Sequence, residues 1–312
     1  MFNCFEDVKD VEECFEGLRL DQVAARMWPE FSREQIKGWL QLGCIQLNGQ
    51  SSKPSIRVHQ GDQIEIDVVM EDRTHAEPEP MALKIVHEDM HILVIDKPAG
   101  LVVHPGAGHW SGTLVNGLVH LDPALAALPR AGLVHRLDKD TSGLLVVART
   151  AQAQESLINQ LKLRSVRRHY KAIALGCVPI RGEVDAPIGR HPRDRVRMAV
   201  VSQGKPALTY YQRLAFANSC SLLDVQLATG RTHQIRVHMA HAGYPLLADP
   251  VYAPVMNEMH QAYQAQLLMK RQALHAWQLG LIHPCSGQAM VWQAELPRDF
   301  HDAACCLFGD IF

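Results

Sequence analysis

Residues 133–149, LVHRLDKDTSGLLVVAR, place a cluster of charged side chains directly before an uninterrupted apolar run. The run from 143 to 148 has the length and composition of a buried strand. His135, Arg136, Asp138, Lys139 and Asp140 fall within the six positions from 135 to 140. Because charge is costly to bury without a partner, the stretch predicts a braced loop whose ionisable groups either hold the fold together or carry chemistry.

The chain around this loop favours an α+β fold. Residues 83–97 are typical of two strands, 113–122 of a short helix and 151–162 of a longer helix. From there to about residue 296, strand-like runs outnumber helical patterns and rarely alternate with them. This order predicts a mixed, mostly antiparallel sheet within a larger domain over residues 82–312, and it argues against a doubly wound parallel sheet.

Residues 17–70 show a second, shorter pattern of helices and strands. Two amphipathic helical segments come first, and the turn signal Asn48-Gly49 then introduces short strands. A separate small α+β domain is therefore expected. Residues 1–16 contain six acids and one base, which suggests an acidic tail, and residues 71–81 carry two prolines and four acids, which suggests an extended, unpacked linker.

Composition and charge limit the classes of function. The formal net charge is -2, yet residues 162–197 hold ten Lys or Arg against three acids. The net charge therefore conceals a basic segment in the middle of the chain. There is no apolar run of eighteen residues and no secretory signal pattern, and none of the eight cysteines forms a C-x-x-C motif. We therefore expect a cytoplasmic protein with reduced thiols, outside the membrane.

Familiar catalytic motifs fit poorly. Asp138 and Asp140 approach the D-x-D-x-T loop of haloacid-dehalogenase phosphatases, but the parallel α/β alternation of that fold is missing. His238 and His241 are spaced for a shared helical face, but no carboxylate accompanies them as a metal ligand. What remains is Asp138 beside Arg136, and the residues alone leave two interpretations open: a structural ion pair or an ionised carboxylate available for chemistry.

Five segments in order resemble the RluA family of RNA pseudouridine synthases. They are LVIDKPAGLVVHPG, GLVHRLDKDTSGLLVVART, RHYKAIALG, LATGRTHQIRVHMAHAGYPLLADPVYA and LHAWQLGLIHP, and the match as a whole runs from about residue 83 to residue 297. Residues 19–49 also resemble the alpha-L RNA-binding module first described in a ribosomal small-subunit protein. This combination is most similar to the RluD type, which acts on large-subunit (23S) ribosomal RNA.

The resemblance implies a role for particular residues. Asp138 matches the catalytic aspartate, Tyr170 the tyrosine that contacts the target base, and Arg236 the arginine that pairs with the aspartate. Arg136 matches the arginine that helps fill the gap left by the flipped nucleotide. In the N-terminal module, the family's RNA contacts carry over to Arg19, Arg33 and Lys37.

The implied reaction is the isomerisation of uridine to pseudouridine after base flipping. It involves no redox or phosphoryl-transfer step, so we expect no metal and no small-molecule cofactor, and we expect a monomer whose partner is ribosomal RNA. Two other hypotheses stay open: a synthase for transfer RNA or a different ribosomal site, and a non-catalytic RNA-binding factor in ribosome assembly.

Overall fold

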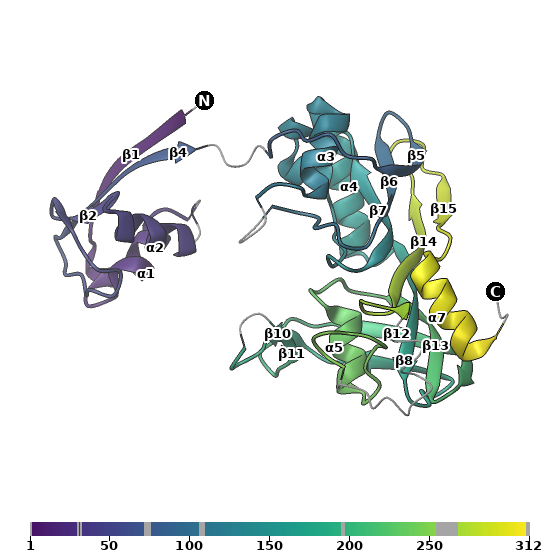
Figure 1. The fold of residues 1–312 in the computed structure, drawn as a ribbon. Helices are drawn as coiled ribbons and strands as arrows, with labels where there is room; N and C mark the ends of the chain where they lie inside the picture. Colours follow the sequence, from purple (N-terminus) through teal and green to yellow (C-terminus); the bar gives the residue numbers. More distant parts are fainter. Residues whose placement is uncertain are drawn as a thin grey trace. The chain divides into compact units, whose positions relative to one another are not determined.

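The computed structural model describes residues 2–29, 31, 33–71, 76–105, 110–194, 197–253 and 268–309. The chain divides into two compact units, Met1–His75 and Ala76–Phe312. Figure 1 shows the helices and strands of each unit. Within the described residues, no helix is long and apolar enough to cross a membrane.

The first unit packs two helices on a four-stranded sheet with the order β1-β4-β2-β3. Its core is built around the buried side chains of Trp28, Ile36 and Ile64, as the amphipathic helical patterns predict. The elements are β1 (Phe2–Asp10), η1 (Glu13–Phe15), α1 (Leu20–Met27), α2 (Arg33–Leu42), β2 (Ile45–Leu47), β3 (Gln50–Ser51) and β4 (Gln63–Glu71).

The prediction of an acidic tail over residues 1–16 was wrong. Residues Phe2–Asp10 form β1, which pairs antiparallel with β4 along its whole length. The charged side chains of this strand have partners: Asp7 accepts a 2.8 Å hydrogen bond from Trp28 Nε1, and Lys9 Nζ donates one of 2.7 Å to the carbonyl of Met27. Composition concealed the strand because acids on its other face remain in solvent.

The prediction of an unpacked linker over residues 71–81 was also wrong in part. Glu71 ends β4, and residues 72–75 lie outside the described residues. From residue 76 onward the segment is extended, as its prolines require, but it is bonded to the second unit. The Glu79 carboxylate accepts from the backbone N–H of Gly112 at 2.9 Å, and Asn116 Nδ2 donates to the carbonyl of Glu77 at 2.8 Å.

The second unit contains a nine-stranded sheet with the order β5-β6-β7-β14-β8-β13-β12-β9, and β15 pairs with β14. Among the described strand pairs, β7 with β14 is parallel and the others are antiparallel. The predicted α+β class with a mixed, mostly antiparallel sheet is confirmed. The strands are β5 (Lys84–Glu88), β6 (Ile92–Lys97), β7 (Ser142–Ala148), β8 (Arg167–Leu175), β9 (Arg181–Asp185), β12 (Leu208–Ala217), β13 (Cys220–Leu227), β14 (Leu274–Ile282) and β15 (Ala289–Gln293).

Helices cover both faces of this sheet, because successive residues of a buried strand point to opposite sides. On β7, Leu145 packs with α3 (Leu114–Leu121), whereas Leu144 packs with α4 (Ala151–Lys162). Farther along the sheet, α5 (Gln234–His241) covers one face and α7 (Arg298–Phe308) the other. The described part of the unit also contains the short elements η2 (Pro123–Ala127) and η3 (Pro129–Gly132) and the hairpin of β10 (Ile188–Arg190) with β11 (Met198–Val200).

The charged loop of residues 133–141 enters the sheet at the parallel β7–β14 contact. Gly143 has a positive φ of 112°, and a Cβ atom there would collide with the carbonyl oxygen of Ala276. Glycine therefore lets β7 approach β14 closely at the point where the loop ends. This contact fixes Asp138, five residues earlier, at the base of a cavity.

Candidate active site

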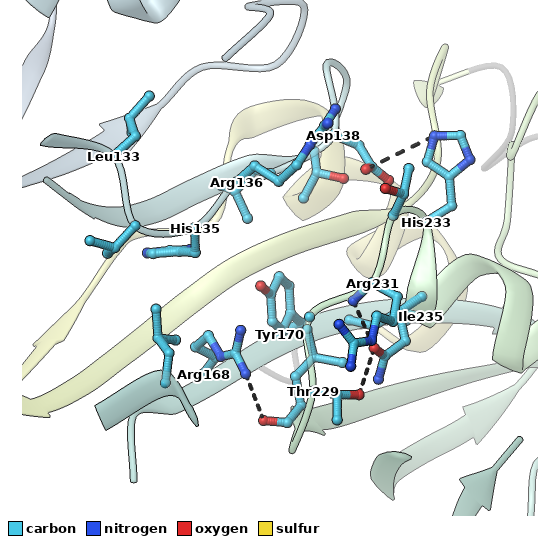
Figure 2. Close-up of a pocket in the computed structure, with 18 of the residues that line it drawn as sticks. Leu133, His135, Arg136, Asp138, Arg168, Tyr170, Thr229, Arg231, His233 and Ile235 are labelled. Carbon is cyan, nitrogen blue, oxygen red and sulfur yellow. Dashed lines mark hydrogen bonds and ion pairs between the residues drawn. The ribbon is translucent and has the colours of Figure 1, made fainter. Parts of the chain in front are cut away.

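A cavity of about 880 Å³ opens in the second unit (Figure 2). Residues of the 133–141 loop, α4, β8, the 227–233 segment and the first turn of α5 line it. Among the described residues, the wall contains seven Lys or Arg side chains and a single acid, Asp138. The seven are Arg130, Arg136, Lys162, Arg164, Arg168, Arg231 and Arg236. The positive field of such a wall suits a polyanionic ligand.

Asp138 and Arg236 meet in this cavity, although 98 residues separate them in the chain. Arg236 Nη1 donates to Asp138 Oδ2 at 3.3 Å, and the carboxylate is 15% exposed. Arg236 reaches the cavity from the first turn of α5, whereas Asp138 comes from the loop before β7. The predicted pair is therefore brought together, and the carboxylate keeps access to the cavity.

Arg236 has a second and closer partner in Asp249, which is fully buried. Two parallel hydrogen bonds join them, from Nε at 2.7 Å and from Nη2 at 2.9 Å. Asp249 also accepts the backbone N–H groups of Val251 and Tyr252. Burial would lower the pKa of Arg236, but the bonds and charge of Asp249, together with Asp138, raise it overall. Arg236 is thus a fixed cation that bridges two carboxylates.

His233 stands on the other side of Asp138 and was missed by sequence reasoning. Its Nε2 lies 4.0 Å from Asp138 Oδ1, and its Nδ1 lies 2.9 Å from the hydroxyl of Tyr252. His233 directly precedes α5 and has a φ of 57°. This uncommon backbone conformation turns its ring toward the cavity. Burial lowers the pKa of His233, an effect that the charge of Asp138 only partly opposes.

Tyr170 lies on β8 and lines the same cavity, with 5% of its surface exposed. It packs with Leu137, Ile235 and Leu274 in one apolar cluster, which fixes the plane of the ring. Burial raises the pKa of Tyr170, so its phenol stays protonated at neutral pH. Arg136 is exposed, in contrast, and lines the cavity beside Asp138.

Main-chain carbonyls brace the Asp138 loop. The fully buried Lys97 Nζ donates to the carbonyls of Pro98 at 2.8 Å, Leu101 at 2.9 Å and Lys139 at 2.9 Å. Arg271 Nη1 donates to the carbonyl of Asp140 at 2.9 Å. Asp140 thus takes part in this bracing through its backbone oxygen.

We expect the burial of Lys97 to make the stability of the protein depend on pH. Its burial lowers the pKa from 10.5 to about 7. Between those two pH values the Lys97 amine is protonated in the unfolded chain and neutral in the folded chain. The free energy of unfolding should therefore increase as the pH rises from about 7 towards 10.5. Urea denaturation at pH 7 to 9.5 should show this rise in the wild type and lose it in Lys97→Met; parallel curves for the two proteins would contradict the assignment.

The three RNA contacts predicted for the first unit fall on one region of its helices. Arg19 Nε donates to Asp21 at 3.0 Å and Arg33 Nη2 donates to it at 2.7 Å, so a single buried carboxylate aligns both arginines. Lys37 is exposed one helical turn beyond Arg33 on α2. These residues belong to the other compact unit and lie outside the cavity described above.

One of the two histidines considered as metal ligands, His238, has other partners. His238 Nδ1 lies 2.9 Å from Thr209 Oγ1, and its Nε2 lies 2.9 Å from the carbonyl of Ala186. Both ring nitrogens are therefore used in bonds that hold α5 against the sheet. Across the described ranges, no group of three or more His, Cys, Asp or Glu is arranged to hold a metal ion.

Comparison with known proteins agrees with this fold. The family model for RNA pseudouridylate synthase matches residues 91–241, which include Asp138, Tyr170 and Arg236, and the S4 domain model matches residues 18–64. The molecule is thus an RNA-modifying enzyme with an added S4 domain. The chain belongs to the RNA pseudouridylate synthase family, whose members are isomerases.

Relatives and solved structures extend the match to most of the chain. Ribosomal large subunit pseudouridine synthase D from Nitrosomonas europaea is 50% identical over 91% of this chain and 82% of its own length. The protein of the same name from Pseudomonas aeruginosa is 49% identical over 91% of this chain and 90% of its own. Human RNA Pseudouridylate Synthase Domain Containing 1 is 27% identical, with a TM-score of 0.56 over 73% of this chain and 90% of that one.

Proposed function

We propose that this enzyme converts uridine to pseudouridine in large-subunit ribosomal RNA, with Asp138 as the catalytic carboxylate. The observation that carries the proposal is the setting of Asp138. It is the single acid among the described residues that line a cationic cavity, and the fixed guanidinium of Arg236 donates to it. The names of the relatives, which refer to the large ribosomal subunit, favour that RNA as substrate.

The reaction exchanges one bond of the nucleoside for another. The N1–C1′ glycosidic bond breaks, the uracil turns, C5 bonds to C1′, and the proton leaves C5 while N1 gains one. Asp138 either attacks C1′ or removes the C2′ proton, and both routes need a carboxylate free of other strong partners. Its bond to Arg236 is long at 3.3 Å, which supports this role because Asp249 receives the stronger bonds.

The remaining cavity residues have roles that follow from their surroundings. The fixed ring of Tyr170 offers a flat face on which a pyrimidine can lie while it turns. The target base must first leave its stack, and the exposed Arg136 is suited to occupy the vacated space. Arg236 acts through Asp138 and is a positioning residue.

We assign RNA contact in the first unit to Arg19, Arg33 and Lys37. Asp21 neutralises part of the charge of the two arginines, whereas Lys37 has its charge free for phosphate within the described structure. Replacing Lys37 by Gln should weaken RNA binding severalfold and reduce the slope of log affinity against log salt by about 0.7 to 0.9. Lys37→Arg, which keeps the charge, is the matched control. Equal slopes in fluorescence-anisotropy titrations of both variants would contradict the assignment.

Experiment can distinguish two alternative functions from the proposed one. A transfer RNA or another ribosomal site would be the substrate if the purified chain modified that RNA and left large-subunit RNA unchanged. A non-catalytic assembly factor would bind RNA and form no pseudouridine, a role for which the Asp138–Arg236 pairing would be superfluous.

The test is incubation of the purified chain with large-subunit RNA and with transfer RNA, followed by pseudouridine mapping. We expect product in the former, formed by a monomer that works in the cytoplasm.

A further inference from the structure

Unsatisfied polar atoms are concentrated in the wall of the cavity. In the described part of the chain, five buried side-chain nitrogen or oxygen atoms have no hydrogen-bond partner. Three of them belong to cavity-lining residues, namely His104 Nε2, His135 Nδ1 and Arg168 Nε. Because native proteins satisfy nearly all buried polar atoms, this clustering indicates that a ligand supplies the partners.

Of these three residues, Arg168 costs the most free energy to bury without a partner. It is 7% exposed. Among the described residues, its sole hydrogen bond is a long one of 3.5 Å to the carbonyl of Leu227, and no carboxylate pairs with it. Burial lowers its pKa. Arg236 in the same cavity is equally buried but bonds to Asp249 at 2.7 Å and 2.9 Å. An unpaired buried guanidinium destabilises the free protein.

His135 adds a second donor beside Arg168. Its Nε2 accepts the backbone N–H of Val146 at 3.1 Å, so the proton of the neutral ring resides on the unpartnered Nδ1. Burial, and then the charge of Arg168, lowers the pKa of His135 to about 3. The ring is therefore neutral, and Nδ1–H is available to donate. Figure 2 shows Arg168 next to Tyr170, with His135 above them.

We infer that Arg168, with His135 beside it, binds a phosphodiester group of the RNA strand next to the uridine that occupies the cavity. A phosphate neutralises the buried cation and accepts its forked N–H groups. A uracil carbonyl would accept a hydrogen bond but leave the charge uncompensated. Arg168 and Tyr170 are alternate residues of β8 and share one face of the strand, so a group bound to Arg168 lies near a base stacked on Tyr170. The inference rests on the proposed use of this cavity for the target uridine.

The first experiment neutralises one phosphate at a time. RNA substrates carry a single methylphosphonate linkage immediately 5′ or 3′ of the target uridine, or at a distant control position. For the wild type, one adjacent linkage should lower kcat/KM by about 10- to 100-fold relative to the unmodified RNA. For Arg168→Gln the same linkage should cost less than about twofold, because the phosphate has already lost its partner. Arg168→Lys, which keeps the charge, should fall between the two.

The second experiment separates RNA binding from a structural role. Arg168→Met removes an unpaired buried cation and keeps an unbranched apolar stem. The RNA-free variant should therefore match or exceed the wild-type thermal midpoint, by up to about 2–4 °C for each kcal/mol gained, while its KM for RNA rises. A structural role predicts a lower midpoint instead.

Three outcomes would overturn the inference. The first is an equal cost of adjacent methylphosphonates in the wild type and Arg168→Gln, and the second is wild-type kcat/KM in Arg168→Gln. The third is the absence of any cost from either adjacent linkage in the wild type, which decides the question even if the variants do not fold. A wild type that forms no pseudouridine in any RNA removes the proposed function and this inference together, whereas an active wild type with uniform linkage effects removes the inference alone.

Discussion

Asp138→Asn should abolish pseudouridine formation, with a loss of roughly 10⁴-fold or more in kcat. The substitution keeps the shape of the side chain and an oxygen that can still accept from Arg236 Nη1, which lies 3.3 Å from Asp138 Oδ2. It removes the charge and the basic lone pairs that either chemical route requires. Single-turnover assays with saturating enzyme measure this loss without interference from binding.

RNA affinity is the internal control for Asp138→Asn. The described wall residues include seven cations and this single acid, so neutralisation of Asp138 should leave the affinity for RNA unchanged or slightly increased. The thermal midpoint should stay close to that of the wild type. Pseudouridine formation at even a tenth of the wild-type rate would show that another group does the chemistry.

Removal of Arg236 should have the next largest effect, on both activity and stability. Arg236→Met leaves Asp249 fully buried without its cation and leaves Asp138 without its donor. Breaking a buried pair in this way costs about 3–5 kcal/mol, and catalysis should fall by about 10²-fold or more as the Asp138 carboxylate loses its position. Denaturant unfolding and single-turnover rates measure the two effects separately.

A second substitution separates the two effects of Arg236. In Arg236→Met/Asp249→Asn the buried charge is gone, and the amide of residue 249 can still accept from the N–H groups of Val251 and Tyr252. We expect the free energy of unfolding to recover most of the loss, whereas the rate stays as low as in Arg236→Met. Recovery of the rate together with stability would mean that Arg236 serves the fold and does not position Asp138.

Sequence reasoning predicted the α+β class and the residues that meet in the cavity, for identifiable reasons. Apolar runs of strand length require a sheet wherever they fall, and the motif around Asp138 pointed to Tyr170 and Arg236 through the family resemblance. Asp249 and His233 lie in the same quoted segment as Arg236, but their importance depends on geometry. The bidentate bond of Asp249 and the left-handed backbone of His233 are consequences of the folded α5 region.

The errors in the prediction have a common physical origin. Residues 1–16 and 71–81 were judged by composition, as acidic and solvated. In the folded protein β1 pairs with β4, Asp7 and Lys9 bond to the end of α1, and Glu79 caps the backbone before α3. Partners distant in sequence made charged segments part of the fold. The unpaired state of Arg168 was equally hidden, because only a structure reveals which cations have no carboxylate.

The most direct test of the central claim is pseudouridine mapping of large-subunit ribosomal RNA from cells that lack this chain. We expect that specific pseudouridines disappear, that wild-type protein restores them, and that Asp138→Asn protein at the same level restores none. An unchanged pattern of pseudouridines in the deletion strain, or full restoration by Asp138→Asn, would contradict the claim.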